Sequence, residues 1–73
     1  MKEIQKIHTE FIRLDDLLKK NGDAATGGIA KLMIQGGFVT LNGEVCTQRG
    51  KKIRPGDLVA IPENKVEIEV EAE

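Results

Sequence analysis

Four cationic side chains lie within six residues of one another in the second half of the chain: Arg49, Lys51, Lys52 and Arg54. Like charges at this spacing repel one another, and a partner of negative charge relieves the repulsion. Arginine and lysine are also the side chains that bind phosphate oxygens most strongly. The segment therefore predicts a basic loop that contacts phosphate groups, in preference to an ordinary solvated loop.

Charge is distributed unevenly along the sequence. From Arg13 to Arg54 the chain has eight Lys and Arg against four Asp and Glu, so this segment is positive. From Pro55 onward it has one Lys against six acidic residues, so the end is negative. The net charge of −1 hides this asymmetry. The distribution favours one face that binds nucleic acid and an acidic C-terminal strand that faces away from it.

Thr26, Gly27 and Gly28 form a second candidate for phosphate contact. Threonine is a good N-cap and predicts a helix from here to about Gln35. The first turn of a helix has unpaired N–H groups and partial positive charge, which can hold a phosphate without a cationic side chain. The two glycines would let an RNA backbone come close. Alternatively, they allow tight packing against the preceding turn, and the sequence favours neither explanation.

Further cations belong to the same expected surface. Arg13 and Lys31 fit it directly. Lys19 and Lys20 are weaker candidates, because their place in the last turn of a first helix is explained equally well by the helix dipole.

Catalytic chemistry finds little support. His8 and Cys46 are the one histidine and the one cysteine, and they form neither a recognisable nucleophile–base pair nor a set of three or four metal ligands. Cys46 is expected to be a packed core thiol. Asp15 and Asp16 are explained by electrostatics in the first helical turn. We therefore expect no enzymatic activity, no metal, no cofactor and no small-molecule substrate.

The aromatic content points to the kind of nucleic acid. The chain has two Phe and no Tyr or Trp, and both Phe11 and Phe38 lie in apolar patterns that predict core positions. Proteins that bind single strands by stacking bases need exposed aromatic rings. This composition favours folded RNA, recognised through its backbone and shape.

Hydrophobic periodicity predicts the first half of the fold. Residues 3–8 predict a strand or an extended arm. A leucine stripe at i, i+3 and i+4 predicts a short helix that ends at Asn21-Gly22. The second helix is expected to be mostly buried, exposing a strip formed by Lys31 and Gln35, because its apolar residues cover a broad arc: Ile29, Ala30, Leu32, Met33 and Ile34.

The period then changes to that of strands. Residues 38–41 and 44–47 predict a hairpin around Asn42-Gly43, and Pro55-Gly56-Asp57 predicts a turn. Residues 58–61 predict a strand. The last strand alternates apolar residues with glutamates and is expected to be a charged edge strand that discourages pairing with other chains: Glu67, Glu69 and Glu71. Together these elements predict a single α+β domain, with two short helices packed on a small, mostly antiparallel sheet.

Several short motifs, in order and spacing, resemble those of the S4 RNA-binding domain. They are Arg13-Leu14-Asp15, then Thr26 with Ala30-Lys31 and Ile34, then Gly37-Phe38-Val39 with Asn42-Gly43, and finally Lys52 to Asp57. The similarity covers Arg13 to about Val59 within a domain of residues 1–73. It implies that the two helices and the adjoining hairpin form an L-shaped surface (an αL-type motif) for structured RNA.

One departure from the family pattern concerns the second helix. Many members have an arginine directly after the residue that begins this helix, where this chain has Gly27. The run Thr26-Gly27-Gly28, the stretch 49–52 and the segment before Arg13 are similar to the small stand-alone bacterial members of the YaaA/YbcJ kind. This resemblance implies ribosomal RNA or a ribosome assembly intermediate as the partner. We also expect the protein to be a monomer.

Two other functions stay open at this point. The acidic strand could dock a basic protein, which would make the chain an adaptor domain. The two short helices could mimic a helix-turn-helix and bind duplex DNA. The chain has no apolar stretch of the length needed to cross a membrane and no signal-peptide pattern, and its single cysteine suits a reducing compartment, so we expect a cytoplasmic protein without membrane contact.

Overall fold

The computed structural model describes the whole chain, residues 1–73, as two α-helices and two small sheets. The larger sheet has five strands in the order β1-β7-β6-β3-β4. These strands are β1 (Lys2–Ile7), β3 (Thr40–Leu41), β4 (Glu44–Val45), β6 (Leu58–Ile61) and β7 (Val66–Ala72). Neighbours are antiparallel except β1 and β7, which run parallel. The predicted α+β fold with a mostly antiparallel sheet is confirmed, and the N-terminal segment is a strand rather than an extended arm.

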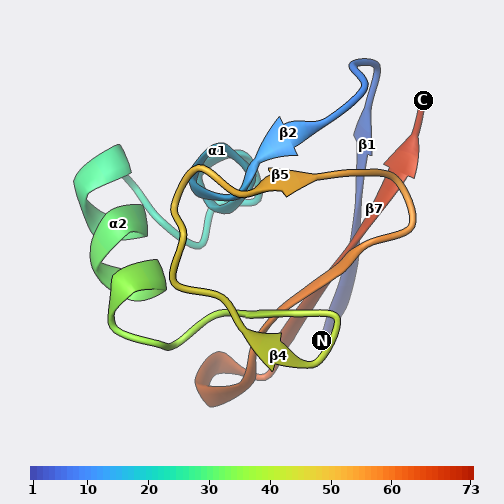
Figure 1. The fold of residues 1–73 in the computed structure, drawn as a ribbon. Helices are drawn as coiled ribbons and strands as arrows, with labels where there is room; N and C mark the ends of the chain where they lie inside the picture. Colours follow the sequence, from blue (N-terminus) through green and yellow to red (C-terminus); the bar gives the residue numbers. More distant parts are fainter.

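The second sheet lies beside the two helices. β2 (Ile12–Arg13) pairs antiparallel with β5 (Lys52–Ile53). The helix α1 (Leu14–Lys20) follows β2 directly, and α2 (Gly27–Gln35) packs mainly against α1. A 3-10 helix, η1 (Pro62–Asn64), joins β6 to β7. Figure 1 shows the two helices on one side of the molecule, with β1 and β7 side by side on the other.

Local signals in the sequence explain the helix boundaries. α1 buries its three leucines and ends at Asn21. Gly22 follows with φ of 85°, a left-handed conformation that glycine adopts without steric cost. The Thr26 hydroxyl caps α2 by accepting a hydrogen bond of 3.2 Å from the N–H of Ile29. Both predicted helices are therefore present, with the predicted stop and start residues.

The two predicted turns are also confirmed. Asn42 and Gly43 both have positive φ, 51° and 89°, as a type I′ turn between β3 and β4 requires. In the second turn Gly56 has φ of 97°, and the N–H of Asp57 donates to the carbonyl of Arg54 at 3.0 Å. These turns join β3 to β4 and β5 to β6.

The hydrophobic core lies between the helices and one face of the larger sheet. It contains 13 buried apolar side chains from both helices, from the strands and from the segments that join them. In β7, Ile68 and Val70 are fully buried, while the alternating glutamates lie on the opposite face. Neither helix has the length and apolar character that a membrane-spanning helix needs.

The expectation that α2 is mostly buried is wrong. Of its apolar residues, Ala30 and Ile34 are buried, whereas Leu32 is 72% exposed and Ile29 is 43% exposed. The reason is that α2 has one main packing partner, α1, so most of its circumference faces solvent. A broad apolar arc in a short helix shows that burial is possible, but the tertiary neighbours decide how much of the arc is covered.

The prediction that both phenylalanines belong to the core is also wrong. Phe38 is 48% exposed, because its ring lies over Gly36 in the turn after α2 and does not enter the core. Phe11 is partly buried, with the ammonium group of Lys52 4.9 Å from its ring centre. The exposed ring of Phe38 borders a hollow whose lining also includes the acidic residues Asp23 and Glu63 and no cation.

The expectation that the last strand is an edge strand is wrong as well. β7 lies inside the sheet, between β1 and β6. β1 takes the edge because it pairs with β7 over its whole length, from Lys2 opposite Glu67 to Ile7 opposite Ala72. The glutamates of β7 therefore lie beside lysines of β1, and they do not protect an open edge.

Candidate nucleic-acid interface

The basic loop is attached to the start of α1 by backbone contacts. The N–H of Leu14 donates to the carbonyl of Lys51 at 2.9 Å, and the N–H of Asp15 donates to the carbonyl of Arg49 at 3.1 Å. Directly beside these bonds, β2 pairs with β5, which places Arg13 opposite Lys52. Cations far apart in the sequence thus meet at one end of α1.

A buried carboxylate lies at the centre of this junction. Asp15 is 3% exposed and is the one buried charged residue of the chain. Arg13 binds it through two nitrogens, Nε to Oδ1 and Nη2 to Oδ2, both at 3.2 Å. Arg49 binds it through Nε to Oδ2 at 3.1 Å. One carboxylate therefore holds two guanidinium groups.

The electrostatic environment keeps Asp15 ionised. Burial by itself raises the pKa of this carboxyl, but the hydrogen bond from Arg49 and the charge and hydrogen bond of Arg13 outweigh it. The N–H of Asp16 also donates to the carboxylate, at 2.9 Å. The net result is a pKa below the ordinary value of an aspartate. The earlier explanation of Asp15 by helix electrostatics alone is therefore incomplete.

The start of α2 faces the same junction. A methyl group placed on Gly27 would lie 3.9 Å from both Nη2 of Arg49 and Nζ of Lys19, so these two cations border the first turn of α2. Lys19 is also paired with Asp16 at 3.1 Å. The first N–H groups of a helix have no partner within the helix, and here they lie beside two cations.

The glycines at the start of α2 are not required by packing. A methyl group on Gly27 or Gly28 would meet no neighbour closer than 3.8 Å, which is ordinary van der Waals contact. Neither glycine has a positive φ. The packing explanation for these residues therefore has no support in the free protein. Their contact with RNA stays a prediction.

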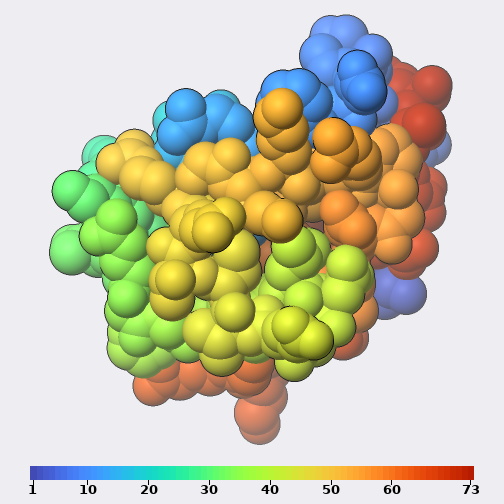
Figure 2. Space-filling view, viewed as in Figure 1, coloured from blue at the N-terminus to red at the C-terminus, as the bar shows by residue number.

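The remaining candidates lie around this junction or apart from it. Lys31 is exposed on α2, one turn after Gly27 and on the same side of the helix. Arg54 lies at the far end of β5, where its N–H donates to Asp57. Lys20 is separate, because its ammonium group donates to the carbonyl of Lys6 at the end of β1. In Figure 2 the basic loop, in yellow and orange, crosses the visible face beside the green surface of α2.

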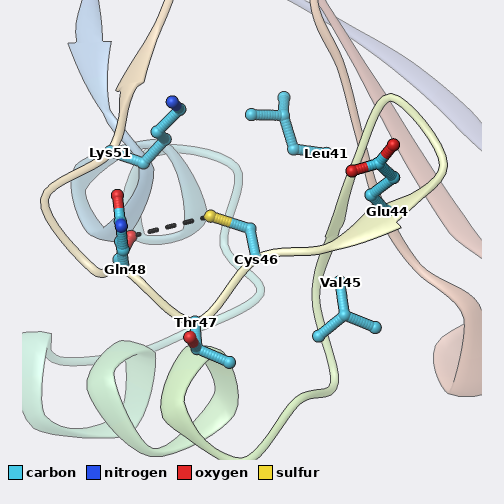
Figure 3. A pocket seen from close by; sticks show the side chains of 7 residues that line it. All are labelled: Leu41, Glu44, Val45, Cys46, Thr47, Gln48 and Lys51. Carbon is cyan, nitrogen blue, oxygen red and sulfur yellow. Dashed lines mark hydrogen bonds between the residues drawn. The ribbon is translucent and has the colours of Figure 1, made fainter.

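Lys51 also borders a shallow hollow of about 280 Å³ next to the hairpin. Figure 3 shows Lys51 and Gln48 on one side of it and Glu44 on the other, with Cys46 between them. Cys46 is half-buried and packs against the core, so it is less enclosed than predicted, because it lies just after the short strand β4, beside a surface hollow. The structure places no three His, Cys, Asp or Glu side chains together as metal ligands.

We call the set of candidates around the two helix starts the basic corner. It consists of Arg13, Lys19, Thr26, Gly27, Gly28, Lys31, Arg49, Lys51 and Lys52. Sequence reasoning named all of these, but it did not foresee the role of Asp15 in holding the two arginines. The sequence signal that could have identified Asp15 was its place in the motif Arg13-Leu14-Asp15, two residues after an arginine.

The glutamates of β7 form a separate acidic surface on the sheet face turned away from the helices. Glu69 pairs with Lys2 across the parallel strands, at 3.0 Å. This hydrogen bond and the charge of Glu69 raise the pKa of Lys2 above its ordinary value. The acidic surface thus has part of its charge neutralised within the sheet.

Comparison with known proteins identifies the family. The model of the S4 domain family matches residues 5–69, which is most of the chain and more than the stretch on which the resemblance rested. No curated protein sequence gives a significant match. Members of this family are generally non-catalytic RNA-binding domains. With this match and an α+β fold whose basic loop lies against two helix starts, the chain belongs to the S4 domain family.

Proposed function

We propose that this protein binds structured RNA without catalysing a reaction, and that the basic corner grips phosphates of the RNA backbone. The observation that carries the proposal is that Arg49 and Lys19 border the start of α2, while the carboxylate of Asp15 holds Arg13 beside Arg49. Cations from two separate segments thus lie beside the first N–H groups of this helix, which have no partner within the helix. Phosphate is the ligand that both kinds of donor favour.

The proposed contact surface extends from this centre in two directions. Along α2 it includes Thr26, Gly28 and Lys31. Along the loop it includes Lys51 and Lys52, with Arg54 as a flanking contact at the far end of β5. Of the two weaker candidates, Lys19 belongs to this surface, and Lys20 does not, because it is bound to the backbone of β1.

Ribosomal RNA or a ribosome assembly intermediate is the partner that the family resemblance favours. Such RNA is folded, and a surface built from cations and backbone groups suits recognition by shape and phosphate position. The exposed ring of Phe38 does not favour base stacking at the proposed site, since the hollow that it borders is lined by Asp23 and Glu63 and by no residue of the basic corner. We further propose that the protein acts as a cytoplasmic monomer.

The adaptor function has less support. The glutamates of β7 are part of an interior strand, and Glu69 is already paired with Lys2. A partner would have to compete with this pair. Duplex DNA is a second alternative, and it is separated from folded RNA by direct comparison.

The test measures the affinity for a folded RNA hairpin at several salt concentrations, with fluorescence anisotropy as the readout. If four or five phosphates are neutralised, the log–log slope of affinity against salt is roughly −3 to −4.5. A DNA duplex of equal length serves as the control ligand and is expected to bind more weakly. A slope near zero, or tighter binding to the DNA, would contradict the proposal. Crosslinking in cells followed by sequencing of the attached RNA then identifies the natural partner.

A further inference from the structure

We infer that Asp15 is a positioning residue for RNA binding. Its buried carboxylate holds the guanidinium groups of Arg13 and Arg49 side by side, so that their free N–H groups can bind the same phosphate. The inference rests on the RNA-binding function proposed above. It adds that the affinity for RNA, an anion, depends on a negatively charged residue of the protein.

The geometry brings the two arginines to a single oxygen. Nη2 of Arg13 lies 3.2 Å from Oδ2 of Asp15, and Nε of Arg49 lies 3.1 Å from the same atom. The distance between these two guanidinium nitrogens is therefore at most the sum of the two hydrogen-bond lengths. Two cations this close repel each other in the absence of a shared counterion. The carboxylate supplies that counterion from below, inside the protein.

Most donors of both arginines stay free. A guanidinium group has five N–H donors, of which Arg13 gives two bonds and Arg49 gives one to Asp15. The side chains are 50% and 39% exposed, so the remaining donors are accessible. Arg49 directs Nη2 towards Gly27. Arg13 lies across Gly50, where a methyl group would come within 3.4 Å of its Nη2. Both side chains are thus fixed in orientation and open on one side.

A simpler explanation is that Asp15 attaches the basic loop to α1. The backbone already makes this attachment, through the N–H groups of Leu14 and Asp15 and through the pairing of β2 with β5. What the carboxylate adds is control over two side chains that would otherwise sample many rotamers. Ordering such side chains in advance lowers the cost of binding.

Electrostatics alone and positioning by Asp15 predict opposite changes in RNA affinity for the variant Asp15→Asn. If charge alone sets the affinity, removing a negative charge next to the site tightens RNA binding. If Asp15 positions the arginines, the same substitution weakens binding, since asparagine accepts fewer hydrogen bonds and its amide N–H groups repel the guanidinium donors. We expect binding of a folded RNA hairpin to weaken about fivefold or more, corresponding to two side chains released from their fixed rotamers.

Asp16→Asn is the matched control. Asp16 is the neighbouring residue, and its substitution removes the same charge. Its side chain is half-exposed and pairs with Lys19 at 3.1 Å. We expect this variant to bind the hairpin as tightly as the wild type or more tightly. Both variants are measured by anisotropy well below their melting temperatures, with the fold checked by the backbone amide spectrum.

Two further measurements separate positioning from a structural defect. The side-chain Nε–H signals of Arg13 and Arg49 should exchange slowly in the wild type and rapidly in Asp15→Asn, while backbone signals away from the basic corner stay unchanged. Arg49→Lys keeps the charge but loses the second arm of the guanidinium fork. We expect it to weaken binding as well, and it tests the inference even if Asp15→Asn does not fold.

The outcomes are distinct. If the wild-type protein binds no RNA, the proposed function fails and the inference fails with it. If the wild type binds, but a folded Asp15→Asn variant binds equally or more tightly, or Arg49→Lys binds like the wild type, the positioning role is overturned while the RNA-binding function stands.

Discussion

The basic corner and the acidic surface of β7 both collect like charges, but they do so in different ways. In the basic corner, two arginines from separate segments meet at the buried carboxylate of Asp15, and Arg49 and Lys19 both border Gly27. On β7, the glutamates come from one strand and are neighbours because side chains alternate along it. The cluster of cations forms only when the chain folds, whereas the row of glutamates follows directly from the alternation of side chains along one strand.

This difference indicates which surface is organised for a ligand. A buried charge is costly, and Asp15 is kept ionised by bonds to two arginines that themselves stay half-exposed. The carboxylates of β7 have no comparable internal order, and the one strong contact among them is the pair of Glu69 with Lys2. Ordering of cations by a buried partner favours ligand binding, while solvated alternating charges favour solubility.

The largest expected effect is on RNA affinity after charge reversal. Lys51→Glu combined with Lys52→Glu should weaken binding about a hundredfold, because each charge-assisted hydrogen bond contributes about 1.5 kcal/mol or more. The salt slope should become shallower by about two, one for each lost phosphate contact. Anisotropy titrations with the folded hairpin measure both quantities.

The matched control is charge reversal on the acidic surface. Glu67→Lys combined with Glu69→Lys should change RNA affinity less than about threefold at physiological salt, where screening acts over about 8 Å. If this variant loses the binding of a basic protein partner, while RNA binding is unaffected by the loop reversal, the acidic surface is the binding surface and the adaptor function is correct.

The next effect distinguishes two glycines of the helix region. Gly36→Ala should destabilise the fold by about 1–3 kcal/mol, because the new methyl group would lie 2.8 Å from the Leu32 carbonyl and 2.9 Å from the Phe38 ring. Gly27→Ala meets no such contact and should leave the free energy of unfolding unchanged or raise it by about 0.5 kcal/mol. Urea unfolding followed by circular dichroism measures both.

RNA affinity gives the complementary result for Gly27. If the RNA backbone approaches the start of α2 closely, Gly27→Ala weakens binding several-fold, and Gly27→Arg weakens it strongly. Tighter binding by Gly27→Arg would show that this position accommodates a phosphate-binding side chain and that close approach is not required.

A smaller effect concerns the pH dependence of stability. The pKa of Asp15 in the folded protein is below its ordinary value of 3.8. Its contribution to stability is therefore fully present above the ordinary value and is lost as the pH falls through the folded-state value. Asp15→Asn should be less stable than the wild type by about 1–2 kcal/mol at pH 7. The difference should shrink on acidification below about pH 4, as measured by urea unfolding at several pH values. A constant difference across this range would contradict the pKa assignment.

The smallest effect is expected at the pair of Lys2 and Glu69. The pKa of Lys2 is raised above 10.5, chiefly by its hydrogen bond with Glu69. The stabilisation is present below the ordinary pKa and is lost as the pH rises through the folded-state value. Lys2→Gln should lower the melting temperature slightly at neutral pH, and RNA affinity should stay unchanged. A loss of RNA affinity comparable to that of the loop variants would show that this sheet face takes part in binding.

Local structure was largely predictable from the sequence. The stop at Asn21, the cap at Thr26 and the Asn42-Gly43 turn act through bonds to nearby residues, so neighbouring residue types suffice to place them. The burial of α2 was not predictable in the same way. Leu32 is as apolar as the buried leucines of α1, but it is exposed because no second element packs on its side of the helix.

The candidate site was likewise predictable only in part from the sequence. The residue types and spacing of the loop 49–54 were enough to predict phosphate contacts, because the chemistry belongs to the side chains themselves. The placement of Arg49 and Lys19 beside Gly27, and of Arg13 beside Arg49 on the Asp15 carboxylate, could not be derived from the spacing. It depends on bonds between residues that are far apart along the chain.

The sequence by itself therefore determined the helix and turn boundaries, the asymmetry of charge and the family to which the chain is similar. These depend on short-range contacts and on composition. The tertiary structure alone decided that β7 lies inside the sheet, that α2 leaves an apolar side open, and that the carboxylate of Asp15 holds two arginines together. The physical reason is that burial and ion pairing between distant segments depend on which surfaces meet when the whole chain folds.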